Sequence, residues 1–231
     1  MLSKGGFLCL IFLLAISFFP SVAGGQGISL EGILDKIQTQ YDMHKDFRAK
    51  FFQESLIKSL GKKQKAEGKV YFKKPGKMRW IYTDPFKQEI ISDGQILWTY
   101  RPEDKQVIVT KMAQAFQSQT PTTFLAGLGN LKRDFQARFD QEPSPGKDYF
   151  LEMTPLESHG SLEKLFLQVD EKTFNILSAK IQDVIGNVTE IRFADIQFDN
   201  HLPDDLFTFS PPQGVEVFRL PGAPPAGPTR K

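Results

Sequence analysis

The fold of this 231-residue chain is decided by residues 68–82, GKVYFKKPGKMRWIY, together with residues 90–100, IISDGQILWTY. In both stretches apolar or aromatic side chains recur at every second position, which is the period of a β-strand with one buried face. The pairs Pro75-Gly76 and Asp93-Gly94 divide the runs and are typical of tight turns. The two stretches therefore predict a meander of three or four antiparallel strands.

The alternation predicts that large apolar side chains gather on one face of this meander. Such a face has to meet a core, a second sheet or an apolar ligand. We expect an apolar cavity lined by Phe51, Met78, Trp80, Ile96 and Trp98. The pleat leaves open which face points inward, and packing in an ordinary core is the alternative for each residue.

The rest of the chain repeats the pattern of short strands and turns. Alternating apolar residues predict further strands within residues 47–53, 107–110, 135–139, 149–153, 165–169, 176–181, 189–198 and 207–217. Many strands joined by tight turns are typical of an antiparallel sheet that curls into a barrel or half-barrel. We therefore expect a mainly β fold with about ten strands and two or three helices.

One helix is predicted near the N-terminus of the mature chain. Ser29 is a typical N-cap, and Leu30, Ile33, Leu34 and Ile37 follow at helical spacing. We interpret this segment as a helix packed on the core. A helix lying on a membrane surface is the alternative, although its polar face lacks the surplus of lysine and arginine typical of such helices.

A second, shorter helix is predicted at residues 122–128, after a Thr120 cap and Pro121 in the first turn. Phe124, Leu125 and Leu128 make this segment apolar, and a helix of its length is marginally stable alone. We expect it to lie against the sheet as a movable lid and to contribute these three side chains to the cavity.

The first 23 residues have the three parts of a secretory signal peptide. Lys4 supplies the positive charge, residues 7–19 are apolar, and Ser21-Val-Ala23 is a small-x-small cleavage site. An uncleaved membrane anchor is the alternative. We predict removal of residues 1–23, a single β-domain over residues 24–217, and a disordered tail rich in proline and glycine over residues 218–231.

The single cysteine, Cys9, lies inside the apolar segment. A lipidated cysteine would follow that segment, so we do not expect a lipoprotein anchor. The mature chain then enters an oxidising compartment without disulfides and depends on its core for stability. The formal net charge of +2 is too small to indicate a nucleic acid or an anionic membrane as a partner.

Sequence motifs for catalysis or metal binding are absent. His44, His159 and His201 stand apart from one another, without the spacing of a metal site. A nucleophile elbow, a phosphate loop and a dinucleotide fingerprint are missing as well. We therefore expect no enzymatic activity, no metal and no cofactor. The 21 phenylalanines indicate a broad apolar interior, which in an exported curled sheet suits a greasy ligand.

Two motifs carry a resemblance to a known family. The first comprises residues 73–75 (KKP), Trp80, Pro85 and residues 92–100 (SDGQILWTY), and the second is residues 207–215, FTFSPPQGV. In this order they closely resemble the LolA-type periplasmic outer-membrane lipoprotein carriers. The resemblance implies an α+β, mainly β fold, an open antiparallel barrel or strongly curved sheet of about ten or eleven strands closed by a lid of short α-helices.

The resemblance also implies a function in the periplasm without catalysis. Such a carrier binds the acyl chains of lipoproteins in its cavity and takes them from the inner-membrane Lol ABC transporter. It hands them to the outer-membrane receptor LolB or an equivalent, and it is expected to be monomeric. A carrier of free lipids, or a lipid-sensing module such as that of a periplasmic anti-sigma regulator, is the alternative with the same architecture.

One position departs from the family pattern. Relatives have an arginine directly before the proline of the Lys-Pro motif, thought to hold the lid shut by hydrogen bonds, and here that residue is Lys74. Arginine offers five fixed donors and lysine three mobile ones. We expect Lys74 to act as a lid lock by donating to the carbonyls that end a nearby helix. A solvated lysine at a strand end is the alternative.

Overall fold

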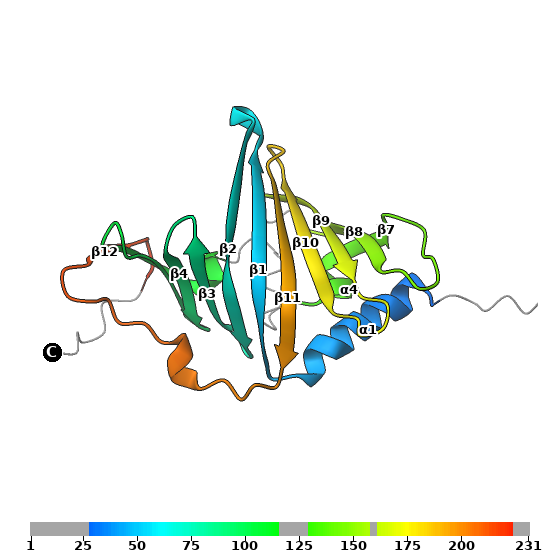
Figure 1. Cartoon of the computed structure of the whole chain (residues 1–231), viewed down its shortest axis with the longest axis horizontal. Helices are drawn as coiled ribbons and strands as arrows, with labels where there is room; N and C mark the ends of the chain where they lie inside the picture. Colours follow the sequence, from blue (N-terminus) through cyan, green and yellow to red (C-terminus); the bar gives the residue numbers. More distant parts are fainter. Residues whose placement is uncertain (1–27, 116–128, 158–160, 224–231) are drawn as a thin grey trace, which may run out of the picture.

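The computed structural model describes residues 28–115, 129–157 and 161–223 (Figure 1). The helical elements are α1 (Leu30–Met43), η1 (Lys58–Leu60), α2 (Met112–Ala115), α4 (Leu131–Asp134) and η2 (Asp204–Phe207). The strands are β1 (Asp46–Ile57), β2 (Lys62–Lys73), β3 (Lys77–Asp84), β4 (Gln88–Asp93), β5 (Ile96–Arg101), β6 (Gln106–Lys111), β7 (Phe135–Phe139), β8 (Tyr149–Pro155), β9 (Leu162–Val169), β10 (Ile176–Asp183), β11 (Val188–Phe198) and β12 (Glu216–Arg219). Within these residues no helix is long and apolar enough to span a bilayer.

The described strands form one 12-stranded sheet in the order β12-β6-β5-β4-β3-β2-β1-β11-β10-β9-β8-β7. All neighbours are antiparallel except β12 and β6, which run parallel. The sheet is strongly curved, and its two edge strands, β7 and β12, do not pair with each other (Figure 1). The predicted mainly β fold with an open, curved antiparallel sheet is therefore confirmed, with 12 strands where about ten or eleven were expected.

The longest strands, β1 and β2, form a hairpin that projects beyond its neighbour β3 (Figure 1). Their pairing continues to Ile57 and Lys62, whereas the last residue of β3, Asp84, lies opposite Glu67. The tip of the hairpin, around η1, is exposed to solvent. Between Lys62 and Ala66, β2 is therefore paired with β1 but not with β3.

Helix α1 covers one face of the sheet, called here the inner face. The Oγ of Ser29 accepts a hydrogen bond from the backbone N–H of Gly32 at 3.1 Å, so the predicted N-cap is confirmed. Ile33 and Ile37 are fully buried and belong to the same apolar cluster as Phe51 and Trp80 of the sheet. The interpretation of this helix as a core element is therefore confirmed.

Ile96 and Trp98 lie on the opposite, outer face, which contradicts the prediction that they share a face with Trp80. Trp80 of β3 pairs with Ile90 of β4, whereas Trp98 of β5 pairs with the next residue, Ile91. Residues directly opposed in antiparallel strands share a face, and consecutive residues point to opposite faces. The two tryptophans therefore point away from each other across the sheet.

The turn between β4 and β5 explains this error. Ser92 pairs with Leu97, so an even-numbered position lies opposite an odd-numbered one. The β2–β3 and β3–β4 turns pair even with even, as in Phe72 with Met78 and Trp80 with Ile90. Even-numbered residues of β3 and β4 thus point inward, whereas in β5 the odd-numbered residues do. Every side chain of β5 therefore lies on the face opposite to the predicted one.

A second apolar layer covers the outer face around β5. It lies beneath residues 199–215, called here the strap, which leaves β11 and runs past β3 and β4 toward β12 (Figure 1). The ring of Phe209 lies 6.3 Å from that of Trp98, and Phe207 is fully buried. None of the buried apolar residues Ile91, Val107, Val109 and Phe207 belongs to the inner cluster.

The start of the strap is held by charged side chains at one end of the sheet. The carboxylate of Asp46 is buried and accepts backbone N–H groups from Asn200 at 2.7 Å and Leu202 at 3.0 Å. The ammonium group of Lys73 donates to the carbonyl of Leu202 at 2.6 Å and lies 2.7 Å from Asp204. Hydrogen bonds that involve a charged group are stronger than neutral ones, so they fix the path of the strap.

The far end of the strap adds a strand to the sheet. β12 continues to Arg219, so it passes the predicted domain end at residue 217 by two residues. The backbone N–H of Leu220 still donates to the carbonyl of Val109 at 3.0 Å. The predicted signal peptide and the last residues of the predicted tail lie outside the described residues.

We predict that Phe207→Ala lowers the free energy of unfolding by about 3–5 kcal/mol, because it removes a fully buried ring and leaves a cavity. The measurement is urea unfolding followed by tryptophan fluorescence. The matched control is Phe86→Ala, whose ring is 69% exposed and whose loss should change stability by less than about 0.5 kcal/mol. Equal effects of the two substitutions would contradict the second apolar layer.

Candidate functional site

The inner face carries a contiguous cluster of aromatic rings, called here the aromatic cluster. The ring centroid of Phe51 lies 4.8 Å from that of Trp80 and 4.9 Å from that of Tyr82. Trp80 also contacts Phe72 at 5.8 Å and Phe193 at 6.4 Å. These separations are typical of favourable aromatic pairs. Four strands, β1, β2, β3 and β11, thus contribute to one apolar surface.

Three of the predicted cavity residues come together on this surface. Phe51, Met78 and Trp80 are almost fully buried and belong to one cluster on the inner face. The predicted lid residues Phe124, Leu125 and Leu128 lie outside the described residues.

Phe72 and Phe193 also belong to the aromatic cluster, although they were not predicted as site residues. Both occupy alternating strand positions: Phe72 lies opposite Met78, and Phe193 lies opposite Phe51. The period of the strands was therefore visible in the sequence, but the pairing that brings β11 next to β1 was not.

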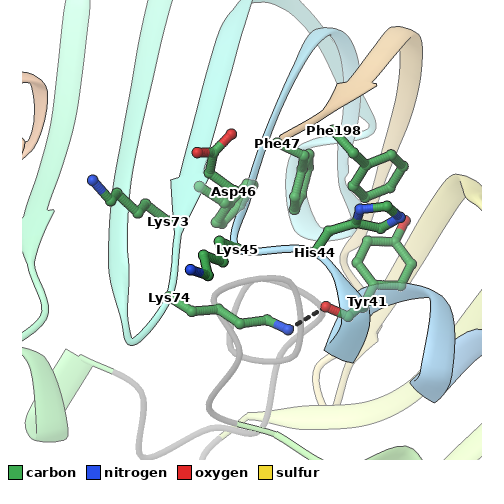
Figure 2. Close-up of a pocket in the computed structure, with 9 residues that line it drawn as sticks. Tyr41, His44, Lys45, Asp46, Phe47, Lys73, Lys74 and Phe198 are labelled. Atoms are coloured by element: carbon green, nitrogen blue, oxygen red, sulfur yellow. Dashed lines mark hydrogen bonds between the residues drawn. The ribbon is translucent and has the colours of Figure 1, made fainter. Parts of the chain in front are cut away.

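Lys74 contacts the C-terminal turn of α1 (Figure 2). Its ammonium group donates to the backbone carbonyl of Tyr41 and lies 3.8 Å from the carboxylate of Asp42. Carbonyls in the last turn of a helix lack intrahelical partners and favour a cation. Partial burial lowers the pKa of Lys74, and the nearby Asp42 carboxylate opposes this shift. Lys74 thus connects the end of the β2 strand to the helix that covers the inner face.

Aromatic and polar contacts hold the same end of α1 to β1 and β11. The ring of His44 stacks on Phe198 at 4.4 Å, and its Nδ1 lies 2.6 Å from the carboxylate of Asp199. Tyr41 makes edge contacts with Phe47 at 5.7 Å and with Phe198 at 5.8 Å. Figure 2 shows these side chains around a cavity of about 10 Å³, which is enough for one water at most.

Residues 42–210 match the family model described as "Outer membrane lipoprotein carrier protein LolA". The chain belongs to the LolA family. The matched residues include the aromatic cluster, Lys74 and the strap as far as Ser210. The resemblance drawn from the sequence motifs is therefore confirmed.

Relatives of this LolA-family chain match over nearly its whole length. The "Outer-membrane lipoprotein carrier protein" of Nitrosomonas europaea is 32% identical over 213 residues, which cover 92% of this chain and 98% of the relative. The protein of the same name from Nitrosospira multiformis is 33% identical over 201 residues, which cover 86% of this chain and 91% of the relative. The similarity is thus not confined to a single motif.

A solved structure shares the fold of this chain. An "uncharacterized conserved protein" from Thermus thermophilus superposes with a TM-score of 0.53 over 82% of this chain and 98% of that chain. The two sequences are 14% identical, so the likeness concerns the fold alone.

The described part of this LolA-family chain has no group of three or more His, Cys, Asp or Glu side chains placed to hold a metal ion. His44 is instead engaged by Asp199 and Phe198. His159 lies outside the described residues. The side chains gathered at the site are mostly aromatic and aliphatic, which suits contact with an apolar ligand.

We predict that the contribution of Asp199 to stability is lost at acid pH. Hydrogen bonds from His44 and from the backbone N–H of Lys45 lower the pKa of Asp199 in the folded chain. A carboxyl group whose folded pKa is depressed stabilises the fold above its unfolded pKa of about 3.9, and this contribution disappears as the pH falls through the folded pKa.

The measurement compares the free energies of unfolding of the parent chain and of Asp199→Asn from pH 6 to pH 2. The parent should be more stable at pH 6, and the difference should shrink below about pH 4. A difference that stays constant over this range would show that the carboxylate of Asp199 has no linked proton.

Proposed function

We propose that this LolA-family protein shields the acyl chains of lipoproteins on its aromatic cluster and carries them across the periplasm. The observation that supports this most strongly is the aromatic cluster itself, which lies on the inner face of a sheet that does not close. The names of its relatives, outer-membrane lipoprotein carrier proteins, agree with an acylated cargo. Burial of an acyl chain contributes about 0.8 kcal/mol per methylene, so a site of this kind supplies ample affinity.

Release requires a competing empty state, because a long acyl chain in full contact would dissociate too slowly. The apolar residues Ile33, Leu34 and Ile37 of α1 supply such competition, since they are buried in the same apolar cluster as Phe51 and Trp80. Cargo that enters has to replace contacts the empty protein makes with itself. The net free energy gained on loading is then the difference between the contacts made with the cargo and those made within the empty protein. Because this difference is small, a receptor can shift the equilibrium from the loaded to the empty protein.

We extend the proposal to the source and destination of the cargo. The protein would receive lipoproteins from an inner-membrane Lol ABC transporter and deliver them to LolB or an equivalent outer-membrane receptor. It would act as a periplasmic monomer after removal of residues 1–23, without catalysis, cofactor or nucleic acid. These partners follow from the family resemblance, and transfer between purified components tests them.

Trp80→Ala should weaken binding of a synthetic triacylated lipopeptide at least tenfold, because it removes the ring at the centre of the aromatic cluster. Trp98→Ala is a matched control, since the same side chain is removed from the outer face. Isothermal titration calorimetry gives the affinities, and thermal melting verifies that both variants are folded. Equal losses of affinity for the lipopeptide in the two variants would argue against the inner face as the binding site.

A free phospholipid with the same acyl chains forms the second arm of this experiment. A carrier of free lipids would bind the phospholipid and transfer it between vesicles without binding the lipopeptide. That result would replace the proposed cargo while leaving the apolar site in place.

Lys74→Leu should leave the sheet folded, load cargo more readily and deliver it more slowly. The substitution removes the donor to the Tyr41 carbonyl and so favours the open state of α1. Loading and transfer to the receptor are measured separately with a purified acylated lipoprotein. Lys74→Arg is the matched variant that keeps the charge and adds fixed donors, so it should load no faster than the parent. If Lys74→Leu loads and transfers like the parent, Lys74 is not the lock.

A further inference from the structure

The inner face changes from apolar to polar on one side of the aromatic cluster, and Tyr82 marks the boundary. Its ring contacts Phe51, while its hydroxyl donates to Oε1 of Gln53 at 3.1 Å. Gln53 donates to Oγ of Ser55 at 3.2 Å, and Ser55 lies 3.1 Å from the hydroxyl of Thr189. These four residues form a continuous hydrogen-bonded row, called here the polar row. Burial raises the pKa of Tyr82 to about 12, so its hydroxyl stays a neutral donor.

The polar row borders an open groove of about 420 Å³, a volume typical of small-molecule sites. The groove lies along the β1–β2 hairpin where this hairpin projects beyond β3. It is continuous with the aromatic cluster, because Tyr82 lines the groove and also contacts Phe51. Further residues that line it are Lys62, Gln64, Lys65, Ala66, Asp84, Pro85, Phe86 and Gln88.

The carboxamides and hydroxyls that line the groove suit groups that both donate and accept hydrogen bonds. A carboxamide has two N–H donors and two acceptor sites on its oxygen. The described contacts of Gln53 use one donor and one acceptor, so one of each is left for a ligand. Peptide groups match the carboxamides and hydroxyls of the lining, because both kinds of group donate and accept hydrogen bonds. Lys62 and Lys65 would attract an anion and Asp84 would repel one, so the phosphatidylglycerol arm of the test below separates a peptide from a lipid headgroup.

We propose that this groove binds the peptide segment that follows the acylated cysteine of a lipoprotein, while the acyl chains lie on the adjoining aromatic cluster. The inference rests on the proposed carrier function and states what that carrier recognises. A lipoprotein presents acyl chains and a peptide side by side, and free fatty acids or phospholipids lack the peptide. The polar row thus gives the protein a means to prefer lipoproteins over the lipids around them.

The test compares the parent chain with the double variant Gln53→Leu, Ser55→Val. Each protein is titrated with a triacylated lipopeptide that has a short peptide of serine and glycine, with palmitate, and with dipalmitoyl phosphatidylglycerol. The double variant should bind the lipopeptide about five- to tenfold more weakly, as expected for two lost hydrogen bonds, and palmitate as well as the parent does. Gln136→Leu, an exposed carboxamide on the outer face of β7, is the matched control and should change neither affinity.

Tyr82→Phe provides an independent variant that keeps the ring and removes only the hydroxyl that orients Gln53. It should lower the affinity for the lipopeptide two- to threefold without changing that for palmitate. If the double variant does not fold, as judged by thermal melting, this variant alone decides the matter.

The remaining outcomes separate the inference from the proposed function. An unchanged ratio of lipopeptide to palmitate affinity in the variants would overturn the peptide groove but leave the carrier function intact. A selective loss of phosphatidylglycerol binding would overturn it in favour of a lipid headgroup. If the parent binds palmitate but not the lipopeptide, the carrier function and the inference fail together.

Discussion

The structure depends on the need to cover an apolar face on a sheet that does not close. The edge strands β7 and β12 do not pair with each other, so the sheet does not close around the aromatic cluster. Its exposure to water would cost about 25 cal/mol for each Å² of apolar surface, which favours burying it in one apolar cluster with residues of helix α1. The same contact is available to an acyl chain, which has no hydrogen bonds to satisfy. A face that needs a cover can therefore accept either its own helix or a cargo.

The two sides of the sheet are covered in physically different ways. On the outer face the strap is fixed by the buried carboxylate of Asp46 and by the ammonium group of Lys73, and its strand β12 adds backbone hydrogen bonds to β6. On the inner face α1 combines apolar contacts with side-chain hydrogen bonds, among them those of Asp35 with Lys132 and of Gln40 with Asn175, and with Lys74 and His44 at one end. Charge-assisted and backbone hydrogen bonds are directional, whereas apolar contacts can be exchanged for others of similar area. Only the apolar part of the contact made by α1 can thus be exchanged for contact with an acyl chain, whereas the buried carboxylate of Asp46 keeps the strap in place.

Along the inner face, the side chains change from apolar to polar. β1 passes from the fully buried Phe51 to Gln53 and Ser55 within four residues, and the neighbouring strands follow the same change through Tyr82 and Thr189. An acylated protein has the same change of chemistry at its modified cysteine. The apolar cluster explains how acyl chains are held, and the polar row supplies a physical basis for choosing among molecules that carry them.

The sequence alone determined the class of the fold, the capped helix α1 and the apolar positions of single strands, because strand period, helix caps and turn residues are local properties. It also placed Lys74 at the end of a strand, next to a turn. Tertiary structure decided which faces meet. The sequence pattern placed Trp98 with Trp80, but the pairing across the β4–β5 turn sends it to the outer face, under a strap from a distant part of the chain. Pairing of β1 with β11 likewise brought Phe193 to Phe51, since contacts between residues far apart in sequence leave no periodic signal within either strand.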